Sequence, residues 1–182
     1  MKKVFIIHFL IILCLGAISA SVINRVSISE EMTYQRYNKI WTSPTTSYYS
    51  VESLASNPIL SNDFDIMFTP NIGITLGTRF GYQWSFYDRN RFVSFPKNIN
   101  GAVNTGLAFS FSNVRLSLSA ILRSSFQTSR NSWISQIGGE IEASYVFSNG
   151  ICLGLGYRYL YCYEMITSGV YVGLGYQLGG EK

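Results

Sequence analysis

The feature that most constrains the fold is an alternation of side-chain types between positions 72 and 86. Apart from Thr78, the even positions from Ile72 to Phe86 carry large apolar or aromatic side chains, and the odd positions carry Gly, Thr, Arg, Gln or Ser. Successive side chains of a β-strand point to opposite faces, so the pattern predicts a strand with one apolar face and one small, polar face. A strand of this length is long for a globular protein, but it suits a tilted strand that crosses a bilayer and projects beyond it.

The same alternation recurs along the chain and predicts seven further strands. They are expected at 22–28, 60–68, 103–111, 114–122, 133–147, 151–163 and 170–178. With 72–86 they make eight strands, an even number, as outer-membrane barrels have.

The lengths of the short turns are set by the requirement that the apolar side chains of neighbouring strands point to the same side of the sheet. This requirement predicts turns at Thr69-Pro70-Asn71, Ser112-Asn113 and Ser148-Asn149-Gly150. Longer connections are expected at 35–59, 88–101, 124–132 and 164–168. Short turns at one end and longer loops at the other are typical of an outer-membrane barrel.

A soluble eight-stranded barrel is the main alternative, and it would present its polar face to water. Here only 13% of residues are charged and 15% are aromatic, and the polar face consists mostly of Gly, Ser, Thr and Asn. The apolar face is also banded, with aliphatic residues in mid-strand, Phe111 and Phe147 near the short turns, and Trp84 and Trp133 near the longer loops. Aromatic girdles around an aliphatic belt indicate a lipid-facing exterior. We therefore predict an all-β fold, an eight-stranded antiparallel up-and-down transmembrane β-barrel.

The first twenty residues form a separate unit. Lys2 and Lys3 precede an apolar run from Val4 to Leu15, and small residues follow, which predicts a signal peptide cleaved after Ala20. Residues 1–20 are thus expected to be removed, leaving 21–182 as the barrel. The removed segment contains His8, the only histidine of the chain.

On these features the chain resembles the small outer-membrane barrels of the OmpA transmembrane-domain, OmpX and OmpW type. The resemblance implies a bacterial outer-membrane location, with the long loops at the cell surface and the short turns in the periplasm. It also implies outer-membrane lipid as a partner, and the barrel-assembly machinery during insertion. The last strand resembles the insertion signal read by that machinery through Gly173, Tyr176 and Leu178, although family members often end on an aromatic residue and this chain adds Gly179-Gly180-Glu181-Lys182.

The inward face of the predicted barrel collects charges. They are Arg25, Glu31, Asp63, Asp65, Arg79, Arg115, Arg123, Glu140, Glu142, Arg158 and Glu164. Buried charges require partners, and pairing across the turn at 148–150 sets Glu140 opposite Arg158. We expect an ion-pair network of Arg79, Glu140, Glu142 and Arg158, which either plugs the lumen or acts as a gate whose re-pairing opens a narrow path.

Catalysis is not expected. Small outer-membrane barrels that modify lipids use a histidine base, and the mature chain would contain none. The pairs Asp63–Asp65 and Glu140–Glu142 could serve acid–base chemistry, but ion pairing with lumen arginines explains them more simply. Cys152 and Cys162 lie on one strand about 33 Å apart, too far for a disulfide. We predict no catalytic residues, no metal site and no cofactor.

The longer connections are basic. Arg89, Arg91, Phe92, Phe95 and Lys97 set cations beside aromatic rings and form a candidate surface-binding loop for an anionic ligand. Nucleic acid is not an expected partner. Two functions remain open: a structural or adhesin-like surface protein with a closed lumen, and a small porin-like channel for ions or slender hydrophobic solutes.

Overall fold

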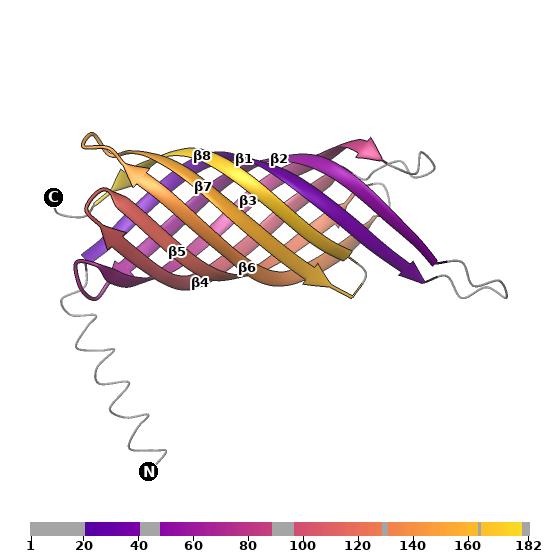
Figure 1. Ribbon diagram of the computed structural model, residues 1–182, viewed down its shortest axis with the longest axis horizontal. Helices are drawn as coiled ribbons and strands as arrows, with labels where there is room; N and C mark the ends of the chain where they lie inside the picture. The colour runs from indigo at the N-terminus through magenta and orange to yellow at the C-terminus, as the bar shows by residue number, and fades with distance from the viewer. Residues whose placement is uncertain (1–20, 41–47, 89–96, 129–130, 164, 180–182) are drawn as a thin grey trace, which may run out of the picture.

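The computed structural model describes residues 21–40, 48–88, 97–128, 131–163 and 165–179, which form a closed barrel of eight antiparallel strands in sequence order (Figure 1). The strands are β1 (Ser21–Ile40), β2 (Tyr48–Met67), β3 (Ile72–Asp88), β4 (Asn98–Phe111), β5 (Val114–Gln127), β6 (Ser132–Val146), β7 (Ile151–Cys162) and β8 (Met165–Leu178). Pairing of β1 with β8 closes the sheet, which confirms the predicted fold class. In the described part of the chain, no helix is long and apolar enough to cross a membrane.

Two of the predicted short turns have the expected geometry in detail. Phe111 pairs with Val114 across a two-residue turn. At the next turn along the chain, the Phe147 N–H donates to the Ile151 carbonyl at 2.8 Å, and Gly150 has a φ of 85°. Only glycine adopts such a φ without steric cost, so this position fixes the three-residue turn.

The expected long loop at 35–59 is wrong. β1 continues to Ile40 and β2 begins at Tyr48, and the two strands stay in register from Gln35↔Ser53 out to Ile40↔Tyr48. The hairpin projects beyond the other strands at one end of the barrel (Figure 1). A strand outside the apolar zone has no reason to alternate apolar and polar residues, so the backbone ladder continues where the pattern fades.

The other three connections are also shorter than expected. β3 extends to Asp88 and β4 starts at Asn98, while residues 128–131 join β5 to β6. Between β7 and β8 only residues 163 and 164 remain, because Met165 and Thr167 are buried inside the barrel and belong to β8. Small and polar residues near this end of β8 obscure its start in the sequence.

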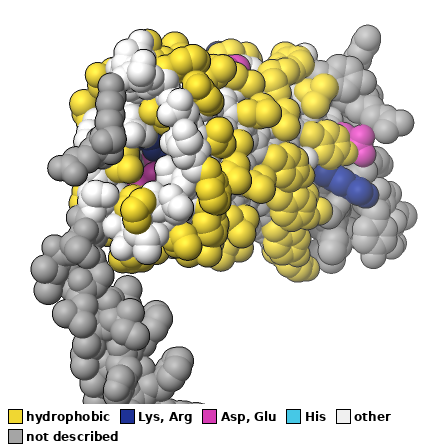
Figure 2. All heavy atoms as spheres, turned by 60° about the vertical axis from the view of Figure 1, so that its left-hand side comes forward, with side chains coloured by type: hydrophobic (Ala, Val, Ile, Leu, Met, Phe, Trp, Pro, Cys, Tyr) yellow, Lys and Arg dark blue, Asp and Glu magenta, His cyan; other side chains and the backbone are white. Residues whose placement is uncertain are grey.

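The outer face is apolar around the barrel. Leu118 and Ile137 are 58% and 64% exposed, whereas their neighbours Ser119 and Gln136 are buried. Hydrophobic side chains cover the middle of the face shown in Figure 2. A continuous apolar surface of this extent on a monomer requires an apolar environment.

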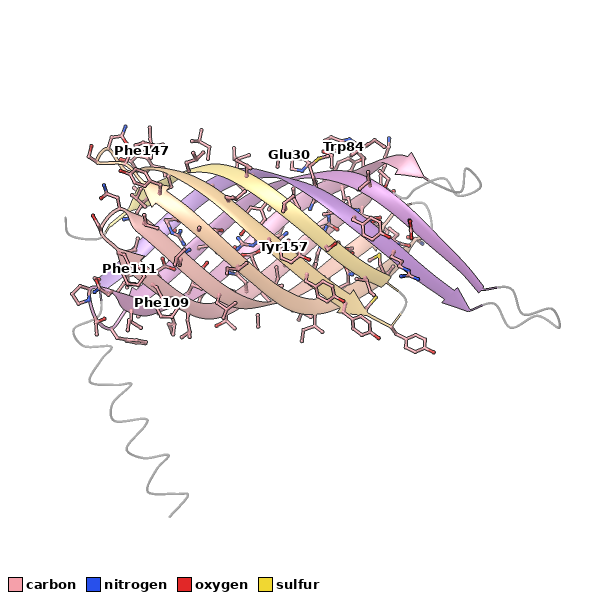
Figure 3. All side chains as sticks on the ribbon, viewed as in Figure 1. Glu30, Trp84, Phe109, Phe111, Phe147 and Tyr157 are labelled. Atoms are coloured by element: carbon pink, nitrogen blue, oxygen red, sulfur yellow. The ribbon has the colours of Figure 1, made fainter. Side chains whose placement is uncertain are left out.

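Aromatic side chains lie toward both ends of this face. Figure 3 shows Phe109, Phe111 and Phe147 near the short turns, and Trp84 toward the opposite end. The two rings of aromatics enclose the aliphatic belt and mark its limits.

Candidate functional site

The lumen holds ten charged side chains of the described residues, all pointing inward as the alternation predicts. Five are arginines and five are carboxylates: Arg25, Arg79, Arg115, Arg123 and Arg158, with Glu31, Asp63, Asp65, Glu140 and Glu142. Glu164 lies outside the described residues. An equal number of opposite charges leaves the described lumen formally neutral.

The first group of ion pairs, the central chain, consists of Asp63, Arg79, Glu140, Arg158, Glu31 and Arg123. Arg79 bridges Asp63, at 3.3 Å, and Glu140. Arg158 bridges Glu140, at 2.6 Å, and Glu31, at 2.8 Å. Acidic and basic side chains thus alternate across the lumen. Each charged group between the two ends of the central chain contacts two groups of opposite charge.

The second group, the short-turn ring, consists of Arg25, Asp65, Arg115 and Glu142. Arg25 contacts Asp65 at 3.3 Å and Glu142 at 3.5 Å. Arg115 contacts the same two carboxylates at 2.6 and 3.4 Å. Two arginines and two carboxylates therefore close a neutral ring on the side of the lumen nearer the short turns.

Tyr171 joins the two groups. Its hydroxyl donates to Glu142 at 2.8 Å, and the Arg158 guanidinium lies 5.1 Å from the centre of its ring. Gly156 on the neighbouring strand makes room for this ring, since a Cβ at that position would lie 2.2 Å from it. The tyrosine therefore couples the central chain to the short-turn ring through a hydrogen bond and a cation–π contact.

The structure brings together three of the four residues expected to form one network. Glu140 and Arg158 are partners in the β6–β7 register, and Arg79 reaches Glu140 from β3. Glu142 instead pairs with Arg25 and Arg115 in the short-turn ring. Two positions along a strand move a side chain by about 7 Å, which carries Glu142 into the next layer of the lumen.

The same layering separates Asp63 from Asp65. Asp63 contacts Arg79 in the central chain, while Asp65 contacts Arg25 and Arg115 in the ring. The two carboxylates therefore serve different ion pairs.

A layer of buried amides was missed by the sequence reasoning. Gln35, Asn57, Gln83, Asn98, Asn100, Asn104, Gln127 and Gln136 all have buried side chains. Asn57 donates to Glu31 at 2.6 Å, and Arg123 donates to Gln83 at 2.9 Å, so this layer continues the central chain. The alternation could have revealed these amides, because each of them is at a position of its strand whose side chain points into the lumen.

The ion pairs leave little room between them at the level of Arg79 and Arg158. A cavity of about 30 Å³ lies among Arg25, Asp63, Arg79, Glu142 and Arg158, room for about one water molecule. At the short-turn end a vestibule of about 1150 Å³ opens outward and reaches in as far as Asp65 and Arg115. The ion pairs therefore separate this vestibule from the rest of the lumen.

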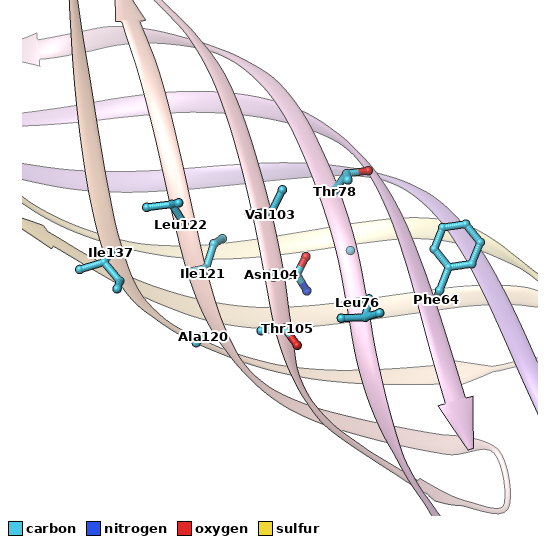
Figure 4. Close-up of a pocket in the computed structure, with 11 residues that line it drawn as sticks. Phe64, Leu76, Thr78, Val103, Asn104, Thr105, Ala120, Ile121, Leu122 and Ile137 are labelled. Atoms are coloured by element: carbon cyan, nitrogen blue, oxygen red, sulfur yellow. The ribbon is translucent and has the colours of Figure 1, made fainter. Parts of the chain in front are cut away.

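A furrow of about 440 Å³ crosses the outer wall, apart from the charged groups (Figure 4). Phe64, Leu76, Leu122 and Ile137 are among its exposed lining residues, and the small side chain of Ala120 also lines it. It forms part of the apolar belt and offers contacts to hydrocarbon.

The remaining predicted sites are only partly described. Arg89, Arg91, Phe92 and Phe95 lie outside the described residues. Lys97 is exposed, and its carbonyl accepts hydrogen bonds from the Thr128 N–H and hydroxyl at 3.1 and 2.7 Å.

The residues expected to form the assembly signal all lie on β8. Tyr176 and Leu178 are exposed on the outer face, and Gly173 points to the other side of the strand, next to Ser29. The outward pair is thus presented where another protein or lipid can contact it.

A closed eight-stranded barrel with an apolar exterior and an ion-paired interior is the fold of the small outer-membrane β-barrels. No protein-family model and no curated protein sequence matches it. Solved structures do: Ail of Yersinia pestis bound to the heparin analogue sucrose octasulfate, at 12% identity and a TM-score of 0.52, covers 86% of this chain and 99% of its own. The match to OprG of Pseudomonas aeruginosa, at 12% identity and a TM-score of 0.52, covers 88% of this chain and 97% of OprG. The match to Neisserial surface protein A, at 12% identity and a TM-score of 0.51, covers 84% of this chain and 96% of that protein. The chain shares the fold of these barrels.

The separation into two ion-pair groups predicts unequal couplings. In a double-mutant cycle, Glu140→Gln with Arg158→Met is expected to show a coupling energy of about 2–3 kcal/mol, because the two groups are buried in direct contact. The matched cycle of Glu142→Gln with Arg158→Met should give under about 1 kcal/mol, since only Tyr171 links them. Urea unfolding of the refolded protein in vesicles measures both, and equal couplings would contradict the layered arrangement.

Proposed function

We propose that this protein is a structural or adhesin-like surface barrel of the bacterial outer membrane, with a sealed lumen and binding loops. The observation that carries the proposal is the neutral set of ion pairs across the lumen, with a cavity of about 30 Å³ among them. A pore needs a continuous wet path, and paired charges that fill an eight-stranded lumen remove it. Eight-stranded barrels of this kind place their function in the connections between strands.

The proposed orientation sets the connections at 41–47, 89–97, 128–131 and 163–164 at the cell surface and the short turns in the periplasm. It is supported by the arrangement general to such barrels, in which extracellular loops are the longer ones. Outer-membrane lipid surrounds the belt, and the barrel-assembly machinery reads β8 through Gly173, Tyr176 and Leu178. The proposed role is non-catalytic.

The proposed ligand is an anionic surface polymer, bound by Arg89, Arg91, Phe92, Phe95 and Lys97. Arginines beside aromatic rings attract sulfate or phosphate groups by charge, and Lys97, the member of the set that the structure describes, is exposed. The Ail structure with a sulfated heparin analogue is a precedent for this ligand chemistry on the same fold.

A small channel is the second candidate. The vestibule of about 1150 Å³ at the short-turn end favours it, because it brings solvent as far as the short-turn ring. Conduction would then require the central chain to re-pair.

Planar-bilayer recording separates the two functions. The refolded wild type is expected to give no resolved single-channel steps, whereas Glu140→Ala with Arg158→Ala should give small ones, because two bulky side chains leave the central chain. Leu118→Ala on the outer face is the control and should behave as the wild type. Reproducible wild-type steps that Arg79→Ala abolishes would contradict the sealed lumen.

Binding to immobilised heparin tests the surface role. The triple change Arg89→Ser, Arg91→Ser and Lys97→Ser is expected to weaken binding about tenfold and to flatten its salt dependence. Arg89→Lys with Arg91→Lys keeps the charge and should retain most of the affinity. Unchanged binding by the triple variant would remove this loop from the proposed site.

A further inference from the structure

Glu30 is a carboxylate on the outer face of the barrel. It is exposed, and its neighbour Glu31 is fully buried in the lumen, where it pairs with Arg158. The two consecutive glutamates therefore meet opposite environments. The Glu31 carboxylate pairs with an arginine inside the barrel. The Glu30 carboxylate faces the medium that surrounds the apolar outer face.

The nearest neighbours of Glu30 along β1 and in the strand register are apolar. Ile28 and Met32 flank it on β1 at 66% and 47% exposure. Pro58 is its partner on β2 and Val172 its partner on β8. A carboxylate among such residues is costly in lipid, and ionisable groups at this depth usually mark a function.

Among the residues that the structure describes, Ser56 is the polar side chain that contacts Glu30. Its hydroxyl donates to the Glu30 carboxylate, and Ser56 is in turn the register partner of Trp84 on β3. Figure 3 shows Glu30 and Trp84 along the same side of the barrel. Glu30 also lies four residues nearer the short-turn end than Tyr34 of β1, about 13 Å along the strand. The pair thus lies on the apolar side of Tyr34, and Ser56 lies beside Trp84 of the aromatic girdle at the end where the longer connections lie.

The chemistry of this pair selects one kind of lipid. An ionised carboxylate only accepts hydrogen bonds and has room for several. The chains and ester carbonyls of an ordinary glycerophospholipid offer no donor at this depth. Acyl chains that carry hydroxyl groups or amide N–H groups, as those of lipid A do, offer donors directly below the headgroup.

We propose that Glu30 and Ser56 form a lipid-binding site on the outer wall that accepts donors from the hydroxylated or amide-linked chains of a lipid A-type molecule. The inference rests on the proposed orientation, which puts this end of the barrel in the outer leaflet. A second copy docked by two-fold symmetry fits less well, because it would set two Glu30 carboxylates against each other.

Native mass spectrometry of the refolded protein tests the site with two probes, lipid A and phosphatidylglycerol. Wild type is expected to retain lipid A, Glu30→Leu to retain it about tenfold less, and Glu30→Gln to lie between, the scale expected for loss of one charge-assisted hydrogen bond. Phosphatidylglycerol, anionic but without chain donors, should bind all three variants alike. Leu118→Ala on β5, four strands away, is the matched control and should retain lipid A as the wild type does.

Unfolding in symmetric vesicles gives a second readout that does not depend on orientation. Glu30→Leu should stabilise the barrel in phosphatidylcholine, where the carboxylate has no lipid donor, and lose that advantage when lipid A is added. Equal lipid A retention by wild type and Glu30→Leu, or a wild-type dimer that Glu30→Leu converts to monomer without changing lipid retention, would overturn the proposal. Failure of heparin binding or a conducting lumen would overturn the proposed function and leave this site intact.

Discussion

The fold depends on one constraint: a sheet of eight strands closes around an interior that side chains alone can fill. The large apolar residues lie on the outer face, so the polar residues of every strand meet in the lumen. Arginines and carboxylates confined there are tolerable only in contact with one another. The central chain and the short-turn ring satisfy this condition, with Arg158 between Glu140 and Glu31 and Arg115 between Asp65 and Glu142. Stability and closure of the lumen therefore have the same physical origin.

Strand direction and side-chain parity could be predicted from the sequence because both are local. The alternation at 72–86 defines the two faces of β3, and the turn of Ser112-Asn113 carries the phase to the next strand. Parity is also sufficient to put Arg79, Glu140 and Arg158 in the lumen. A side chain on a strand has two directions to choose from, and burial of the apolar face decides between them.

Depth in the lumen and the ends of strands could not be predicted in this way. Glu142 has the parity of Glu140 but lies one layer further along, and its partner Arg25 comes from a strand that the sequence places only through barrel closure. The ends of β1 and β2 were missed for a different reason: backbone pairing continues from Gln35↔Ser53 to Ile40↔Tyr48, where the sequence shows no alternation of apolar and polar residues. Long-range register is a property of the closed barrel, and no short window of sequence contains it.

A glutamate carboxylate also has different surroundings on the two faces of the barrel wall. Glu31 pairs with Arg158, whereas Glu30, one residue earlier, has the Ser56 hydroxyl as its polar partner among the described residues. The roles of both residues depend on which face of each strand points outward and which points into the lumen. Accessibility of nitroxide labels placed one at a time at Ser117, Leu118, Ser119 and Ala120 of β5 tests that assignment most directly. Labels at Leu118 and Ala120 should be reached by oxygen dissolved in lipid, and those at Ser117 and Ser119 should be shielded from it. A hydrated label at Leu118 would contradict the account.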